Sequence, residues 1–180
     1  DKNKIWGYDF ECYSRISWWC VTFINYKDRN NIITIINNRQ LLIQFYELHK
    51  DEIFVSYNGR QYDTGIFKGI LDGMNVGYVN DKLIKEGKKP FQVVKNHKNY
   101  PLNDYDAILK DKSLKQLEAF MGDDIRETEV DFNIDRPLTE AEIEQTKIYN
   151  IHDVSELLKV LDACWNDFEG QLDIIEFLSY

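Results

Sequence analysis

The first predicted strand of the chain reads Ile5-Trp6-Gly7-Tyr8-Asp9-Phe10-Glu11, an apolar run that ends in two acids one residue apart. Successive side chains of a strand point to opposite faces, so Asp9 and Glu11 share one face. Their carboxylates repel each other unless a cation lies between them. Mg²⁺ and Mn²⁺ are hard cations that bind oxygen ligands, so this pair is a candidate metal site. In an acidic chain, the same pattern by itself is also typical of a solvated strand face.

Two further strands follow the first one, at residues 18–24 and 32–36. Both are rich in β-branched and aromatic side chains, and polar breaks at 14–15 and 27–31 separate them from their neighbours. The three strands together predict an antiparallel meander.

Beyond the meander, the pattern changes to an alternation of helices and strands. The predicted elements are a helix capped by Asn38 and ending near Leu48, a strand at 53–57, a helix from about 62 to 71, a strand at 105–109 and a helix at 113–121 that stops at Gly122. This order predicts an α/β fold with a mixed central sheet flanked by helices.

The last long helix begins at a capping box, with Thr139 at the cap and Glu142 three residues later. Its apolar stripe consists of Ile143, Ile151, Val154, Leu158 and Leu161. Tyr149 and Asp153 are four residues apart, so they are neighbours on one face, which lies away from that stripe. A single pair of this kind is also typical of a solvated helix surface.

The composition indicates one globular domain over residues 1–180, because 43% of the residues are hydrophobic and 14% are aromatic. No stretch is long enough for a membrane span and no leader opens the chain, so we expect no membrane partner. Three cysteines without metal-ligand spacing indicate reduced thiols and an intracellular setting. The chain begins with Asp and ends within an apolar-periodic stretch, which fits a domain cut from a longer protein.

The net charge of −9 is unfavourable for binding nucleic acid, but the charge is unevenly spread. Residues 73–101 contain six of the 16 lysines and are interpreted as an excursion from the core, a lid or a substrate-facing arm. The basic residues there are Lys82, Lys85, Lys88, Lys89, Lys95 and Lys98. A solvated loop is the alternative interpretation.

A third polar group follows the strand at 53–57, with a turn at Asn58-Gly59 and an acid, Asp63, at the start of the next helix. In chain order, Asp9-x-Glu11, Asn58-x-x-x-Tyr62-Asp63 and Tyr149-x-x-x-Asp153 resemble the three motifs of the DnaQ-like 3′–5′ exonucleases, the DEDD superfamily. The resemblance spans nearly the whole chain.

The third motif resembles the tyrosine variant of that superfamily. The histidine variant would need His five residues before Asp153, where this chain has Ile148, and His152 does not fit that role. Residues 112–160 are also similar to exonucleases encoded by bacteriophages, free-standing or joined to a polymerase, through Ser113-Leu114-Lys115-Gln116-Leu117, Glu129-Val130-Asp131-Phe132 and Tyr149-Asn150-Ile151-His152-Asp153-Val154.

The resemblance implies a ribonuclease H-like fold and a site that holds two Mg²⁺ or Mn²⁺ ions. It implies that Asp9 bridges both ions, that Glu11 and Asp153 complete the site on the nucleophile side, and that Asp63 supports the second ion. Tyr149 would orient the attacking water and assist its deprotonation.

For the substrate, the resemblance assigns Asn58 and Tyr62, together with Phe10 and Cys12 beside the first two acids. Asn58 would steady the site or the terminal nucleotide, and Tyr62 would offer a stacking surface. Many relatives have Thr or Ser after the Asp-x-Glu pair where this chain has Cys12, which leaves the contact with the 3′ end open.

The implied function is a metal-dependent 3′–5′ exonuclease that hydrolyses the terminal phosphodiesters of single-stranded DNA and releases nucleoside 5′-monophosphates. The expected partner is a single-stranded DNA 3′ end, and a polymerase domain or subunit if the activity is proofreading. The alternatives are a 3′–5′ exoribonuclease with the same site and a non-catalytic accessory domain that binds nucleic acid.

Overall fold

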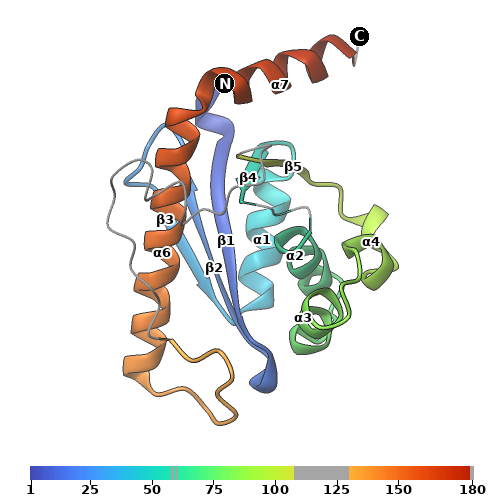
Figure 1. Ribbon diagram of the computed structural model, residues 1–180, viewed down its shortest axis with the longest axis vertical. Coiled ribbons are helices and arrows are strands. Elements are labelled where there is room, and N and C mark those ends of the chain that lie inside the picture. Colours follow the sequence, from blue (N-terminus) through green and yellow to red (C-terminus); the bar gives the residue numbers. More distant parts are fainter. Residues whose placement is uncertain (58, 60, 108–129, 179–180) are drawn as a thin grey trace.

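The computed structural model describes residues 1–57, 59, 61–107 and 130–178. Its strands are β1 (Ile5–Tyr13), β2 (Trp18–Asn25), β3 (Ile32–Ile36), β4 (Ile53–Ser56) and β5 (Asn103–Asp106). Its α-helices are α1 (Arg39–His49), α2 (Asp63–Leu71), α3 (Val76–Ile84), α4 (Pro90–Val93), α6 (Glu140–Ala163) and α7 (Trp165–Leu178). Short 3-10 turns occur at η1 (Lys2–Lys4), η2 (Ser14–Ile16) and η3 (His97–Asn99). Figure 1 shows their arrangement.

The five strands form one mixed sheet in the order β3-β2-β1-β4-β5. The β1–β2 and β2–β3 pairs are antiparallel, as the predicted meander requires, and β1–β4 and β4–β5 are parallel. The predicted α/β fold is confirmed, and its topology is consistent with the ribonuclease H-like type. β1 lies at the centre and pairs with β4 only from Ile5 to Gly7, so its second half has an open edge on that side.

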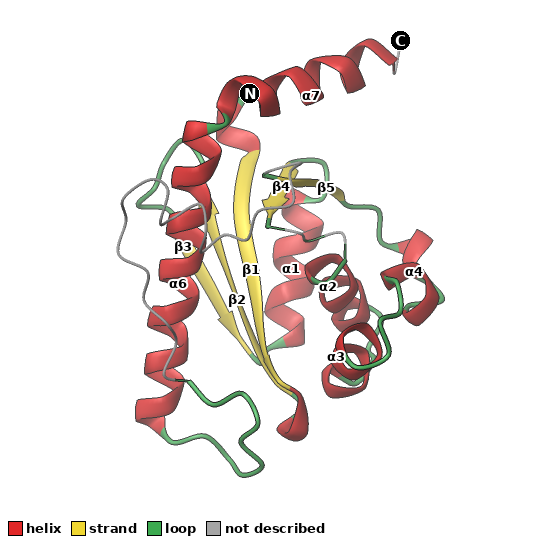
Figure 2. Cartoon of the chain, in the orientation of Figure 1, coloured by secondary structure: helices red, strands yellow, loops and turns green. Residues whose placement is uncertain are grey.

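Helices cover both faces of the sheet (Figure 2). On one face, the side chains of Tyr8, Phe10 and Phe23 form an aromatic core with Phe45 of α1 and Phe67 of α2. On the other face, α6 packs against the sheet through a separate apolar cluster that contains Ile5, Val55, Val154, Leu158 and Leu161. The alternation along β1 therefore divides its side chains between two cores.

Gly7 brings α6 unusually close to β1. A Cβ atom at this position would lie 2.6 Å from Cδ2 of Leu158 and 3.4 Å from Cγ1 of Val154. Real Cβ atoms do not approach other carbon atoms so closely, so a larger residue would push the Leu158 side chain aside. Gly7 lies two residues before Asp9 on the same face, and its close packing fixes the distance between the first acids and α6.

Two predicted helix caps are confirmed. The Asn38 side chain accepts a hydrogen bond from the Leu41 amide at 3.1 Å and so begins α1. At the start of α6, Thr139 Oγ1 accepts from the Glu142 amide at 3.1 Å, and Glu142 Oε1 accepts from the Thr139 amide at 2.9 Å. This capping box fixes where the long helix starts.

The segment at 73–101 is folded against the core, which corrects the expectation of an excursion away from it. Its apolar side chains Val76, Val79, Leu83 and Val93 belong to the same core cluster as the aromatic residues. The positions of Val76, Val79 and Leu83 follow a helical spacing, which the abundance of lysine obscured in the sequence. The lysines instead lie on the outer side of a packed layer.

Part of the predicted structure lies outside the described residues, namely the helix at 113–121 and the strand beyond Ala107. The three cysteines are free thiols, and Cys12 and Cys20 are buried. Within the described ranges, no helix is both long enough and apolar enough to cross a membrane.

Candidate active site

Three carboxylates from distant parts of the chain converge between β1 and α6. Asp9 and Glu11 extend from the face of β1 that α6 covers, and Asp153 extends from α6 itself. One carboxylate oxygen from each lies within 4.8 Å of those of the other two, and all three residues are partly buried. The structure thus brings together the first and the third motif that the sequence singled out.

Asp63 approaches this group from the opposite side, at the start of α2. Its side chain is only 3% exposed, and its Oδ1 accepts a hydrogen bond from the Phe10 amide at 2.9 Å. This contact satisfies a backbone donor on the open edge of β1, beyond the last residue that pairs with β4. Asp63 lies outside the group of three mutually close ligand atoms, although its charge raises the pKa of Glu11.

Burial raises the pKa values of Asp9, Glu11 and Asp63, and neighbouring negative charges add to the effect at Glu11 and Asp63. Burial raises the pKa of Asp9 to about 6, while hydrogen bonds with Glu11 and Asn150 oppose the shift. Burial also raises the pKa of Glu11 well above its usual range, and the charges of Asp9, Asp153 and Asp63 add to this effect. The pKa of Asp63 is raised for the same reasons, by burial and then by the charge of Asp9. Without a cation, the ionised cluster is therefore costly to fold.

The donor set fits a small divalent cation. Oxygen ligands of an octahedral Mg²⁺ lie about 2.1 Å from the ion, and hence about 3.0 to 4.2 Å from one another. The three clustered atoms need only small side-chain adjustments to reach that spacing. Among the described residues, Asp9, Glu11 and Asp63 form no ion pair with a basic side chain. Asp9, Glu11 and Asp153 would hold one ion, and Asp63 with Asp9 could support a second.

Tyr149 lies beside the same acids, half-buried at the edge of the packed face of α6. Burial raises the pKa of its hydroxyl, and the charges of Asp153, Glu11 and Asp9 raise it further. The phenol is therefore neutral at ordinary pH, so it acts as a hydrogen-bonding group rather than as a base. The sequence placed the helix face of Tyr149 and Asp153 away from the apolar stripe. In the structure this face borders the sheet, because Asp153 lies next to Asp9 and Glu11 of β1.

Sequence reasoning missed Asn150, which is fully buried on α6. Its Nδ2 donates to the carbonyl oxygen of Asp9 at 3.0 Å and to the Asp9 carboxylate oxygen Oδ2 at 3.3 Å. Its Oδ1 is buried and has no hydrogen-bond partner in the described part of the chain. The sequence did contain a signal: Asn150 is four residues before Val154, so it lies on the apolar stripe of the helix. A polar side chain at such a buried position needs a hydrogen-bond partner.

Three of the residues assigned to the substrate lie in or against the aromatic core. Phe10 and Cys12 are 2% and 8% exposed, and their side chains point into the aromatic core on the face away from the acids. Burial also raises the pKa of the Cys12 thiol to about 12, so it is neutral. The partly buried Tyr62 packs against that core and donates to Asn80 Oδ1 at 2.6 Å. Asn58 lies outside the described residues.

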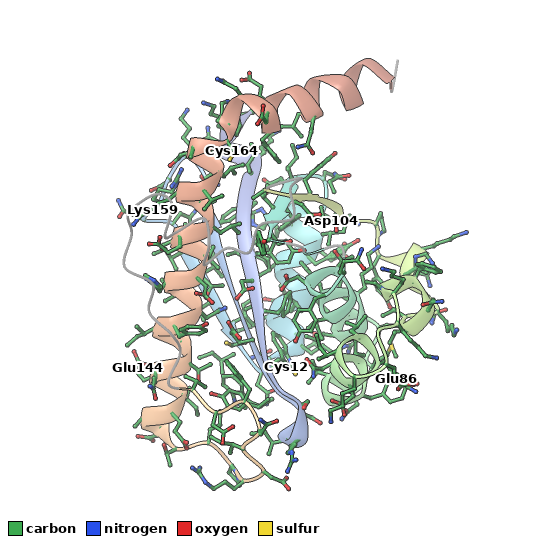
Figure 3. The ribbon with its side chains drawn as sticks, viewed as in Figure 1. Cys12, Glu86, Asp104, Glu144, Lys159 and Cys164 are labelled. Carbon is green, nitrogen blue, oxygen red and sulfur yellow. The ribbon has the colours of Figure 1, made fainter. Side chains whose placement is uncertain are left out.

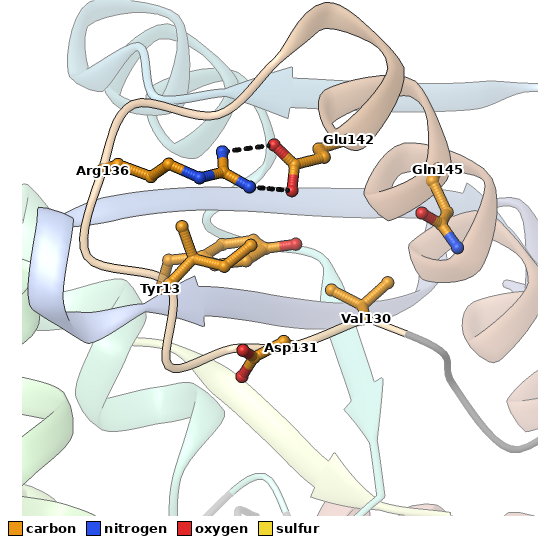
Figure 4. Close-up of a pocket in the computed structure, with 7 residues that line it drawn as sticks. Tyr13, Val130, Asp131, Arg136, Glu142 and Gln145 are labelled. Carbon is orange, nitrogen blue, oxygen red and sulfur yellow. Dashed lines mark hydrogen bonds and ion pairs between the residues drawn. The ribbon is translucent and has the colours of Figure 1, made fainter.

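The seam between β1 and α6 continues past the acids into a cavity of about 220 Å³ (Figure 4). Tyr13 follows Glu11 on the same face of β1, and Gln145 precedes Tyr149 by one helical turn. Across the cavity, Arg136 forms a two-pronged ion pair with Glu142 at 2.7 and 3.0 Å, which lowers the pKa of Glu142 to about 2. The remaining lining residues are Val130, Asp131 and Ile134.

Another acid that sequence reasoning missed is Asp106, at the end of β5. Its Oδ1 accepts from the Gly59 amide at 3.0 Å, and its charge raises the pKa of Asp63. β4 and β5 are parallel neighbours, so their carboxyl ends lie at one edge of the sheet. Asp106 is the second residue of the predicted strand at 105–109, whereas the observed β5 ends at this residue, so its place at the sheet edge was not evident from the sequence.

No family model, curated protein or solved structure matches this chain.

Proposed function

We propose that this protein is a metal-dependent 3′–5′ exonuclease that removes nucleoside 5′-monophosphates from single-stranded DNA. The observation that carries the proposal is the convergence of Asp9, Glu11 and Asp153, three carboxylates from β1 and α6 with oxygens within 4.8 Å of one another. The order of the motifs along the chain, with Asp63 at the start of α2, supports the same conclusion.

The side chains of the site have separable tasks. The carboxylates of Asp9, Glu11 and Asp153 bind cations, and Asp63 both supports this site and fixes the edge of β1 through the Phe10 amide. When bound, two divalent ions supply positive charge for the phosphate and lower the pKa of a water molecule. The neutral hydroxyl of Tyr149 orients the attacking water. Asn150 holds the Asp9 carboxylate in place from α6.

The cavity beyond the acids offers room for the terminal nucleotide. It lies on the same seam as the acids, and the guanidinium of Arg136 and the amide of Gln145 line it with polar groups. The preference for DNA over RNA is part of the proposal and does not follow from this geometry. An enzyme distinguishes the two sugars through contacts to the 2′-hydroxyl.

The test is a time course of cleavage on a 5′-labelled DNA strand and its RNA counterpart, with Mg²⁺, Mn²⁺ or EDTA. If the protein is this exonuclease, the labelled strand should shorten from its 3′ end by single nucleotides, which gives a ladder of products. The ladder should be absent in EDTA and with the Asp9→Asn variant. Faster cleavage of the RNA strand would favour the exoribonuclease. If the folded, metal-loaded protein cleaves neither strand, it is instead a binding domain, or a domain that needs a polymerase partner.

A further inference from the structure

A second cavity lies on the outer side of α2, away from the acids. Its volume is about 240 Å³, and its walls come from the turn before α2, from α2 itself and from the lysine-rich segment around α4 and η3. The side chains that matter for its chemistry are Gln61, Thr64, Lys68, Lys89, Phe91 and His97.

Two lysines supply positive charge to this cavity, and both are held in place. Lys89 Nζ donates to Gln61 Oε1 at 2.7 Å, and Lys68 Nζ donates to the carbonyl oxygen of His97 at 3.4 Å. Burial lowers the pKa of Lys68, and the nearby Asp104 carboxylate opposes that shift. Asp104 itself, labelled in Figure 3, accepts a hydrogen bond from the Thr64 hydroxyl. The partly desolvated ammonium group of Lys68 next to an open space favours an anionic ligand, and the exposed Lys89 adds a second positive charge.

The same cavity carries an exposed aromatic face. Phe91 is 59% exposed, although it lies beside the buried residues Pro90 and Val93. Its ring is inclined by 60° to the His97 ring, with the centroids 6.4 Å apart, so the two rings do not stack on each other. A single-stranded nucleic acid needs this combination, because its bases stack on aromatic side chains and its phosphates pair with lysines.

The surrounding surface adds unpaired positive charge. Lys82 of α3 and Lys85, which directly follows that helix, form ion pairs with Glu86 and Asp81. Among the described residues, Lys88, Lys95 and Lys98 form no ion pair, and all three are exposed in the same segment. Lys88, Lys95 and Lys98 thus add positive charge to the segment that forms one wall of the cavity, in a chain whose net charge is −9.

Two residues that line the cavity are neighbours of Asp63 in the sequence. Gln61 and Thr64 flank Tyr62 and Asp63, and the Cα atoms of Gln61 and Asp63 are at most about 7.6 Å apart because two peptide units separate them. We propose that this cavity holds an internal nucleotide of a single-stranded substrate, with its base against Phe91 and its phosphate at Lys68 and Lys89, while the 3′ end of the strand lies at the acids. This inference rests on the proposed nuclease function.

The test is binding of 5′-fluorescein oligothymidylates of two to twelve nucleotides, measured by fluorescence anisotropy in Mg²⁺. A phosphorothioate at the last linkage keeps the strand intact. Phe91→Ala should weaken binding of the 12-mer about 5- to 50-fold and leave the dinucleotide within about 2-fold. Lys89→Ala should weaken the 12-mer and reduce the slope of log Kd against log salt by about 0.7. The matched controls are Tyr78→Ala, which removes another exposed aromatic ring, and Lys50→Ala on α1.

Equal binding of all lengths by the intact protein and by Phe91→Ala would overturn the inference. A Phe91 effect that is as large for thymidine 5′-monophosphate as for the 12-mer would also overturn it, and would assign the cavity to free nucleotide. Cleavage assays separate this inference from the proposed function. Binding that depends on Phe91, without any cleavage, would refute the exonuclease activity but support the nucleotide-binding cavity. Cleavage with the same KM in Phe91→Ala as in the intact protein would support the exonuclease activity but refute the cavity's role.

Discussion

Asn150 of α6 donates its side-chain amide to both the backbone carbonyl and the carboxylate of Asp9 on β1, at 3.0 and 3.3 Å. The two residues are 141 positions apart in the chain. The contact joins the strand that carries the first two acids to the helix that carries the last one. It also restricts the Asp9 carboxylate to one orientation, which is a general way of preparing a ligand for a metal.

Replacing Asn150 by Ala should damage both folding and function. The Asp9 carbonyl loses its donor in a partly buried contact, which costs about 1 to 3 kcal/mol in the free energy of unfolding. Metal affinity and cleavage rate should each fall about 10- to 100-fold, because the Asp9 carboxylate is no longer held. Denaturant unfolding and Mn²⁺ titration measure the two effects. Asn166→Ala, at an exposed asparagine of α7, is the control, and an Asn150→Ala protein with intact Mn²⁺ affinity would refute the role.

Replacing Gly7 by Ala should separate β1 from α6. The new Cβ would lie 2.6 Å from Leu158 Cδ2, so the protein should lose about 1 to 3 kcal/mol of stability. The displacement should also weaken Mn²⁺ binding, because Asp9 and Asp153 lie on the two elements that move apart. Leu158→Val removes the clashing atom, so the double variant should recover stability relative to Gly7→Ala. Purely additive losses in the double variant would contradict the packing explanation.

The stability of the metal-free protein should fall as the pH rises from 5 to 8. Asp9 has an ordinary pKa of 3.8 and a folded-state pKa of about 6, so its protonated form favours folding. This contribution is fully present below the unfolded-state pKa and is lost as the pH rises through about 6. The raised pKa values of Glu11 and Asp63 act in the same direction. Glu142, whose pKa is lowered to about 2, changes its protonation below this window.

Denaturant unfolding in EDTA and in Mg²⁺ tests this pH dependence. Mg²⁺ should stabilise the protein more at pH 8 than at pH 5, because protonated carboxylates compete with the ion. Glu11→Gln should flatten the pH dependence in EDTA and raise stability at pH 8. A metal-free protein that becomes more stable between pH 5 and 8 would contradict the electrostatic account of the cluster.

Tyr149→Phe should slow cleavage without weakening the metal site. The hydroxyl is neutral because its pKa is raised, so removing it takes away one hydrogen bond to the attacking water and no ligand. We expect a fall in kcat of about 10- to 100-fold and unchanged Mn²⁺ affinity. Tyr78→Phe, at an exposed tyrosine, should change neither value. An equal loss of Mn²⁺ affinity in Tyr149→Phe would instead place the phenol among the groups that bind the metal.

Most of the fold could be predicted because its signals are local. The β-branched run Ile32–Ile36, the Asn38 cap and the Thr139 capping box each determine nearby backbone through short-range sterics and hydrogen bonds. The packing of α3 was not predicted, because the lysines from Lys82 onward favoured the interpretation of an excursion from the core. Only the tertiary structure shows that the apolar side of α3 covers α2.

The candidate site could be predicted only in part. Strand alternation indicated that Asp9 and Glu11 share a face, and the same alternation puts Phe10 and Cys12 on the other one. Nothing local connects Asn150 to Asp9, because their contact depends on how closely α6 crosses β1 at Gly7. Long-range approach of this kind is set by packing, which a single sequence does not display.

The most direct test of the metal centre is a Mn²⁺ titration followed by the EPR signal of the free ion. The intact protein should bind two ions per chain, and Asp153→Asn should lose at least one of them or bind about 10-fold more weakly. Glu144→Gln, at an exposed acid on the side of α6 away from β1 (Figure 3), should bind as the intact protein does. Folded Asp153→Asn that binds Mn²⁺ with unchanged stoichiometry and affinity would contradict the claim that these carboxylates form one site.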